Sequence, residues 1–223
     1  EEYTLVPETH AYRLTSNVGI EGGILAETLA CVLHGYDRLN LRAGSSALIL
    51  GAGCVGLLWT ELLRKSPITT LIQTEIIDFR AKLAEELGAE IVINPTRDNL
   101  KKAVLQASPG GVDYLIDATG DATPIQEALP LVRKGGTVML FGVCPSQQSL
   151  AVEPFEMFNR ELTIMGSKMP PATLERAARL VESGLISQKK LVNKVLPLSK
   201  ISAGVELFHK GKSETVKIAV VPD

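Results

Sequence analysis

Apolar and polar positions alternate through the middle of this chain in blocks that predict strands and helices in turn. Short apolar runs rich in β-branched residues predict buried strands, and longer stretches with apolar residues at helical spacing predict helices between them. Strands are expected at residues 46–50, 69–74, 90–93, 112–116, 137–141 and 162–165. Helices are expected at residues 55–65, 78–87, 99–107 and 123–134, the second of them with Asp78 as its N-cap and Gly88 as its stop.

This alternation predicts an α/β fold built on a doubly wound parallel sheet of the Rossmann type. Each strand–helix–strand succession forms a right-handed crossover, which keeps the strands parallel. Both ends of the chain break the rhythm, with helices expected at 25–39, 173–183 and 201–210 and a last strand at 215–221. We therefore expect both ends to belong to a second structural unit that the Rossmann domain interrupts.

The first strand runs directly into a glycine turn, Gly51-Ala52-Gly53-Cys54-Val55-Gly56, which opens a helix. Gly51 permits the tight turn, and Gly53 has no Cβ, so the backbone can approach a pyrophosphate. Gly56 lets the helix lie close to the strand. The N–H groups at the positive end of the helix would then hold the pyrophosphate. In this context the motif predicts a dinucleotide site.

An acidic residue stands where such a site needs one. Glu75 ends the second strand, 22 residues after Gly53, close to the usual interval of about 20 residues. A carboxylate there accepts hydrogen bonds from ribose hydroxyls and repels a 2′-phosphate, which favours NAD over NADP. Arg80 argues slightly the other way, since a nearby arginine can hold that phosphate, although it also fits a surface position on its helix.

Two more turns follow strands at the same edge of the predicted sheet. Asp117-Ala118-Thr119-Gly120 follows the fourth strand, and Phe141-Gly142-Val143 follows the fifth. Ligands of open α/β sheets bind at the carboxyl ends of the strands. Both turns are therefore candidate walls of the cofactor site, with a plain turn as the alternative.

Composition and charge remove several classes of function. The chain has 23 basic and 25 acidic residues, so it carries no positive footprint for nucleic acid. No apolar run approaches the roughly 20 residues that span a bilayer, so we expect no membrane partner. Its 3 cysteines form no disulfide or metal pattern, which favours a reducing, cytoplasmic location.

No residue is assigned a catalytic role. None of the 3 histidines belongs to a zinc motif, and neither a G-x-S-x-G elbow nor a Walker A lysine is present. Cys54 lies at a helix N-terminus, which lowers the pKa of a thiol. A spacer within the glycine turn is the simpler interpretation of that cysteine.

The chain resembles the medium-chain dehydrogenase/reductase superfamily, specifically the zinc-type alcohol dehydrogenases, and is most similar to the sorbitol/arabitol (polyol) branch. The resemblance runs through nearly the whole chain. The segments that carry it are AETLACVLHGYDRL, ALILGAGCVGLL, QTE, DFRAKLAEELGAEIVINP, DYLIDATG, LVRKGGTVMLFGV and ELTIMGS.

The resemblance implies a domain plan. Residues 1–43 would be the remnant of a GroES-like catalytic domain with its connecting helix. Residues 44–190 would be the NAD-binding Rossmann domain, and residues 191–223 the C-terminal segment that returns to the catalytic domain. The family's GHE segment, its structural-zinc lobe and its catalytic zinc ligands have no counterpart here. We therefore expect either a fragment or a natural short form.

The resemblance also implies functional residues. Gly51, Gly53, Val55 and Gly56 match the pyrophosphate turn, with Cys54 inside it, and Glu75 and Arg80 match the adenosine-ribose site. Gly120 matches a wall beside the adenosine half, and Gly142, Val143 and Met165 match backbone positions near the nicotinamide.

Glu27 matches a glutamate that lies beside the zinc in the polyol branch, although Thr28 replaces the usual proline after it. As an alternative, Glu27 is a charge near the start of a helix. Zinc needs three or four ligands, so Glu27 alone cannot hold it.

Three hypotheses follow for function. The first is the NAD(H)-binding portion of a zinc-type polyol or alcohol dehydrogenase, inactive alone because the zinc ligands are absent. The second is a non-catalytic NAD(H)-binding protein that senses redox state or acts as a partner in a protein assembly. The third, a zinc-free reductase of the same superfamily, is disfavoured by Glu27. The resemblance also implies a homodimer or higher homo-oligomer, formed through the sheet edge near residues 149–152.

Overall fold

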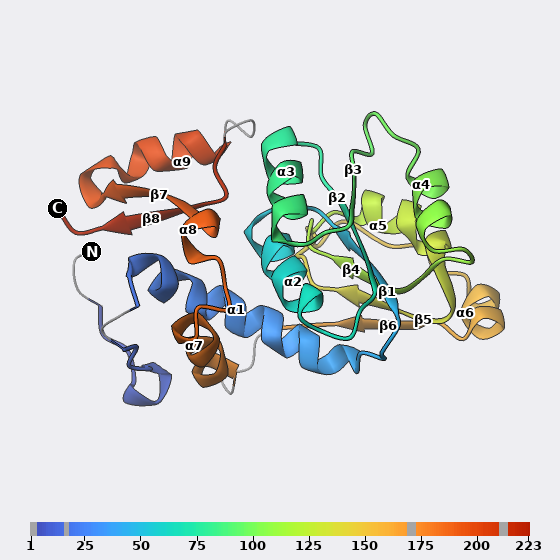
Figure 1. Cartoon of the computed structure of the whole chain (residues 1–223), viewed down its shortest axis with the longest axis horizontal. Coiled ribbons are helices and arrows are strands. Elements are labelled where there is room, and N and C mark those ends of the chain that lie inside the picture. Colours follow the sequence, from blue (N-terminus) through green and yellow to red (C-terminus); the bar gives the residue numbers. More distant parts are fainter. Residues whose placement is uncertain (1–3, 16–17, 169–172, 210–213) are drawn as a thin grey trace. The chain divides into compact units, whose positions relative to one another are not determined.

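The computed structural model describes residues 4–15, 18–168, 173–209 and 214–223, which form two compact units (Figure 1). Residues 34–168 form one of them, here called the Rossmann unit. The described residues on either side of that segment form the other, here called the terminal unit. Helix α1 (Ile20–Leu39) continues from the terminal unit into the Rossmann unit.

The Rossmann unit is built on one parallel sheet of six strands in the order β3-β2-β1-β4-β5-β6, which confirms the predicted doubly wound fold. Its strands are β1 (Ser46–Leu50), β2 (Thr70–Thr74), β3 (Ile91–Ile93), β4 (Val112–Asp117), β5 (Val132–Leu140) and β6 (Thr163–Gly166). The order reverses between β1 and β4, and open α/β sheets bind their ligands in the crevice at such a switch point. β3 and β6 are the two edge strands.

Helices cover both faces of this sheet, because the strands are apolar on both sides. They are α2 (Cys54–Arg64), α3 (Asp78–Leu87), α4 (Leu100–Ala107), α5 (Ala122–Ala128) and α6 (Pro154–Arg160). Figure 1 shows α2 and α3 side by side, away from α4 and α5. Leu48 and Ile72 pack with Val104 of α4 and Ile125 of α5 in one buried cluster. Every residue of β1 is buried, as expected for a strand enclosed on both faces.

The start of α3 differs from the prediction, whereas its end agrees. The N-cap position belongs to Ile77, and no side chain caps the helix there. Asp78 is instead the first helical residue, and its carboxylate pairs with Arg97. Gly88 does terminate the helix, with φ +117° and its N–H donated to Ala84 and Glu85.

The predicted helix at 123–134 is wrong in its second half. Helix α5 ends at Ala128, a short 3-10 turn follows, and β5 already begins at Val132. Pro130 lies in that turn, and proline has no N–H with which to continue a helix. The prediction also missed α6, a seven-residue helix that starts at Pro154.

The terminal unit combines short helices with a small parallel sheet. Besides the start of α1, its elements are a 3-10 turn (Glu8–His10), α7 (Leu174–Glu182), α8 (Gln188–Leu191), β7 (Val192–Pro197), a second 3-10 turn (Leu198–Lys200), α9 (Ile201–His209) and β8 (Lys217–Val221). Strand β7 was not predicted, and residue 210 of the predicted helix 201–210 lies outside the described residues. Asn193 links the ends of the sheet, since its amide donates to Glu214 O and accepts from Val216 N.

None of the helices in the described ranges combines the length and the apolar character that crossing a membrane requires.

The lack of space for a side chain at Gly56 yields a prediction about stability. A Cβ at Gly56 would lie 2.1 Å from the carbonyl oxygen of Gly51, far inside van der Waals contact. We expect Gly56→Ala to lower the free energy of unfolding by about 1–3 kcal/mol, as overpacking does. Chemical denaturation measures it. Gly53→Ala is the matched control, because a Cβ there meets no atom within 4 Å. Equal losses in the two variants would contradict the packing role of Gly56.

Candidate functional site

The glycine turn is held at the end of β1 by hydrogen bonds that Gly51 donates to Thr74 of β2. Gly51 adopts φ +87°, a conformation that favours glycine. Its N–H donates to Thr74 O at 3.0 Å and to Thr74 Oγ1 at 3.2 Å. Leu57 N donates to Gly53 O at 2.9 Å, which closes the first turn of α2. The amides that precede Leu57 at the start of α2 are those that a helix leaves without an intrahelical partner.

The three glycines of the motif have different reasons to be glycine. Gly51 needs its positive φ, and Gly56 needs the space that the Gly51 carbonyl already fills. Gly53 has neither need, because its φ is −68° and a Cβ would meet nothing within 4 Å. The protein's own atoms therefore do not explain Gly53. A glycine that keeps space open beside helix N-terminal amides fits a bound pyrophosphate, whose oxygens must approach that backbone.

A buried polar network underneath the turn was not predicted. Gln73 Nε2 donates to Gly51 O at 2.9 Å, while Thr60 Oγ1 lies 2.5 Å from Gln73 Oε1 and 2.9 Å from Gly56 O. Both side chains are fully buried. The network fixes the carbonyl that Gly56 packs against. The signal in the sequence was a polar glutamine directly after the apolar pair Leu71-Ile72 in a strand predicted to be buried.

Glu75 lies beside the turn, as its position after β2 predicted, and its carboxylate is held by three backbone amides. Oε2 accepts from Ala52 N at 2.8 Å, and Oε1 accepts from Ile76 N at 2.8 Å and Ile77 N at 2.9 Å. The residue is 7% exposed. A carboxylate offers about four acceptor positions, so one remains available. Glu75 therefore both positions the glycine turn and presents a fixed negative charge at the crevice.

The turns after β4 and β5 interlock at the same edge. Asp117 is fully buried, and its Oδ1 accepts from Thr119 N at 2.8 Å and from Thr119 Oγ1 at 2.6 Å. Gly142 N donates to Asp117 O at 2.9 Å. A Cβ at Gly142 would lie 2.2 Å from Gly120 N, so the two turns are in contact. Thr119 in turn reaches the glycine turn, since its Cγ2 would lie 3.0 Å from a Cβ at Gly51.

The structure thus brings four strand ends together and places the other predicted site residues around or away from them. Cys54 and Val55 are the first two residues of α2, and Arg80 lies half-buried in the first turn of α3. Val143 follows Gly142, with its side chain 92% exposed. Met165 lies in β6 and lines a separate hollow of about 270 Å³ together with Arg38 and Thr137.

Glu27 belongs to a small polar cluster in the terminal unit. Its Oε1 accepts from Cys31 Sγ at 3.4 Å, and its Oε2 accepts from Thr28 Oγ1 at 3.4 Å. Lys217 Nζ donates to the same Thr28 hydroxyl at 3.2 Å. Burial, and after it the carboxylate of Glu27, raises the pKa of the Cys31 thiol to about 11, so this thiol is protonated at neutral pH.

The cluster does not fit a zinc ion. The cluster offers at most Glu27 and Cys31 as protein ligands, and zinc needs three or four. In the part of the chain that the structure describes, no three His, Cys, Asp or Glu residues are grouped so as to hold a metal. The position of Glu27 beside a zinc therefore stays a prediction from resemblance.

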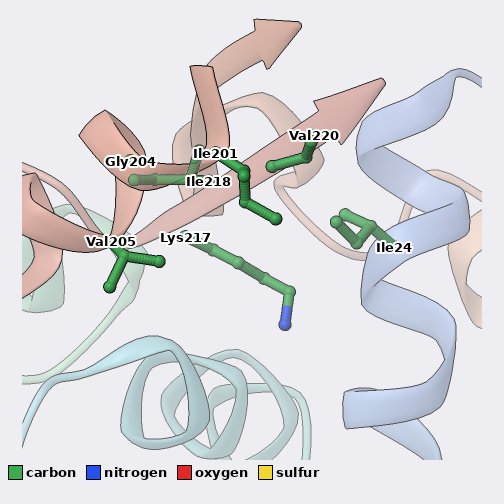
Figure 2. Close-up of a pocket in the computed structure, with 7 residues that line it drawn as sticks. All are labelled: Ile24, Ile201, Gly204, Val205, Lys217, Ile218 and Val220. Atoms are coloured by element: carbon green, nitrogen blue, oxygen red, sulfur yellow. The ribbon is translucent and has the colours of Figure 1, made fainter. Parts of the chain in front are cut away.

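The terminal unit also contains an apolar cavity of about 460 Å³, shown in Figure 2. It is lined by Ile24 of α1, by Ile201, Gly204 and Val205 of α9, and by Lys217, Ile218 and Val220 of β8. Lys217 is the one charged residue among these seven, and Figure 2 shows its side chain extending between Val205 and Ile24.

Similarity to curated proteins covers nearly the whole chain but not the whole of those proteins. The D-altritol 5-dehydrogenase of Agrobacterium fabrum is 30% identical over 98% of this chain and 63% of its own length. The sorbitol dehydrogenase of Bacillus subtilis is 26% identical over 100% of this chain and 63% of its own length. The chain thus spans less than two thirds of the length of these relatives.

Solved structures agree with the fold. A putative zinc-binding dehydrogenase from Sinorhizobium meliloti 1021, bound to NADP, superposes with a TM-score of 0.92 at 33% identity. The superposition covers 99% of this chain and 65% of that one.

The sequence profile of the family described as "Zinc-binding dehydrogenase" matches residues 54–183, more than half of this chain. The match starts at the first residue of α2, so it includes that helix and the strands β2, β4 and β5, but not β1. The chain belongs to the zinc-binding dehydrogenase family.

Proposed function

We propose that this chain is the NAD(P)-binding portion of a zinc-type polyol or alcohol dehydrogenase, with NAD as its preferred cofactor. The observation that carries the proposal is Gly53, whose missing side chain leaves open space beside the first amides of α2 although no protein atom needs that space. Several relatives are polyol dehydrogenases by name, among them those for D-altritol and sorbitol. The reaction class we infer is hydride transfer between a secondary alcohol and nicotinamide.

The residues of the Rossmann unit supply binding and orientation. The turn from Gly51 to Gly56 would receive the pyrophosphate on its amides, with the α2 dipole favouring the negative charge. The interlocked turns at Gly120 and Gly142 would form the wall on the β4 and β5 side. A bound nicotinamide supplies the hydride-accepting carbon, and the protein's contribution is to place that carbon and exclude competing reactions.

Glu75 would select the cofactor. Its remaining acceptor position suits a ribose hydroxyl, while its charge, fixed by three amides, would repel a 2′-phosphate. The solved relative from Sinorhizobium meliloti is bound to NADP. We infer that the two proteins differ in this preference, with Glu75 favouring NAD here.

Catalysis would need parts that the described residues do not supply. The cluster around Glu27 contains no third metal ligand within the described ranges. We propose that the apolar cavity beside Lys217 receives the zinc-binding catalytic portion of the family, on the same polypeptide or on another. That portion would cover the half-exposed side chains of Ile201 and Val205.

The open cavity also favours a second candidate function, a non-catalytic NAD(H)-binding protein that docks on a partner. Exposed apolar surface of this kind usually marks an interaction site. The two candidates differ in whether addition of the family's catalytic portion restores alcohol oxidation.

Two finer proposals concern assembly and location. We propose a homodimer formed at the free edge of β6 and the preceding residues 149–152, since an uncovered edge strand invites pairing. The three cysteines are free thiols, which favours a reducing, cytoplasmic compartment.

Cofactor binding tests the main proposal. We expect saturable NADH binding to this chain by isothermal titration calorimetry. Gly53→Ala should weaken it at least tenfold, because the new Cβ occupies the space next to the pyrophosphate, while the free energy of unfolding changes by less than about 1 kcal/mol. An absence of saturable binding up to millimolar NADH would refute the proposal.

Glu75 gives a second prediction. Glu75→Gln keeps a side chain of the same size but removes the negative charge, so the preference for NADH over NADPH should fall about tenfold or more. Some stability should also be lost, because the new NH2 group replaces an oxygen that accepts from a backbone amide. Glu75→Ala should lower the preference too, and also cost about 1–3 kcal/mol of stability, because it leaves the buried Ala52 amide without its acceptor. An unchanged ratio of dissociation constants in both variants would remove Glu75 from the ribose site.

The inactivity of the chain on its own is a third prediction of this proposal. Metal analysis of the purified chain should find well below one zinc per chain, and NADH formation from sorbitol or other polyols should stay at background. One tightly bound zinc per chain would show instead that the chain assembles a metal site.

A further inference from the structure

The loop after β3 is tied to the end of β2, next to Glu75. Glu75 N donates to Ile93 O at 3.0 Å, and Asn94 Nδ2 donates to Ile76 O at 3.2 Å. Asn94 is 7% exposed, and its carbonyl accepts from both Arg97 N and Asp98 N, which folds residues 94–98 into a compact turn. This turn therefore holds Arg97 at a fixed position beyond the carboxyl ends of β2 and β3.

From that turn the Arg97 side chain reaches back to the start of α3. Its guanidinium pairs with Asp78 Oδ1 at 2.5 Å. Asp78 follows Glu75 by only three residues, so the pair borders the ribose side of the proposed cofactor site. The side chain of Arg97 is 60% exposed and that of Asp78 is 76% exposed, so both are accessible to a ligand in solution.

We propose that the Asp78–Arg97 ion pair strengthens the preference for NAD over NADP that Glu75 sets, an inference that rests on the proposed cofactor site. Arg97 carries the planar, multiple-donor group that binds phosphate best. Asp78 occupies that group and adds a negative charge beside the one on Glu75. With Asp78 in place, a 2′-phosphate meets two carboxylates and an arginine that is already paired. Without Asp78, the same arginine is free to bind the phosphate.

The energetics make the pair a suitable selector. An exposed ion pair contributes little to stability, so it can be broken without unfolding the chain. A 2′-phosphate, by contrast, carries close to two charges, so its interaction with this pair is larger than that of a ribose hydroxyl. Breaking the pair should therefore change the ratio of NADPH to NADH affinity more than it changes the stability of the chain.

The test is a double-mutant cycle on the full chain, with Asp78→Asn, Arg97→Gln and the combined variant. Dissociation constants for NADH and NADPH are measured by calorimetry at one ionic strength, since salt screens exposed charges. We expect Asp78→Asn to raise NADPH affinity relative to NADH about tenfold, as a newly available charge-assisted bond would. The combined variant should lose most of that gain.

A matched control removes a similar carboxylate at the other edge of the sheet. Glu156 pairs with Arg160 at 3.6 Å on α6, next to β6, and its side chain is 45% exposed. Glu156→Gln should leave the NADPH-to-NADH ratio unchanged, and thermal melts should show all four variants folded.

Each outcome decides the matter. If the wild-type chain binds NADH and Asp78→Asn leaves the ratio of NADPH to NADH affinity unchanged, the role of the Asp78–Arg97 pair is refuted. The proposed function is not refuted by that result. An equal gain in Asp78→Asn and in the combined variant overturns the role of Arg97, because loss of negative charge alone would then suffice. Wild-type chain that binds neither nucleotide overturns both.

Discussion

The contact on which this structure depends is the approach of helix α2 to the carbonyl of Gly51. At Gly56 the helix comes so close to the Gly51 carbonyl that no Cβ fits. The side-chain amide of Gln73 donates a hydrogen bond to the same carbonyl oxygen. This packing brings the start of α2 directly to the end of β1, with its first amides at the crevice where the strand order reverses. The position and direction of those amides follow from it, and so does the space beside Gly53.

Much of the Rossmann unit was predictable because each local signal agreed with the global fold. Apolar runs with β-branched residues marked all six strands, and Gly88 marked a helix end. When local propensity, apolar pattern and turn residues all agree with the overall fold, the fold can be predicted from the sequence. The errors arose where a single residue overrode the pattern. Pro130 ended a helix that the apolar spacing extended to residue 134, and Pro154 began a helix in a segment to which no element had been assigned.

The candidate site was predicted in its residues but not in their interactions. Spacing alone located Glu75, yet nothing in the sequence shows that three backbone amides hold its carboxylate. Asp78 was assigned as a cap because its residue type favours that role. In the structure it lies one position further along, and its carboxylate faces a residue from the next loop. Contacts between separate loops depend on strand order, which the pattern of one chain segment does not contain.

The proposed cofactor site lies entirely within the Rossmann unit. In the Rossmann unit the turns after β4 and β5 contact each other at Asp117, Gly120 and Gly142, and Thr119 connects them to the glycine turn. A site braced in this way pays little ordering entropy when a ligand binds, which is the physical meaning of preorganisation. The terminal unit instead presents a protonated Cys31, a lysine that bonds to a hydroxyl, and an open apolar cavity. These features suit a surface that another protein segment covers. If the proposed function holds, the chain would bind a dinucleotide in a preformed site, and another protein segment would supply the chemistry.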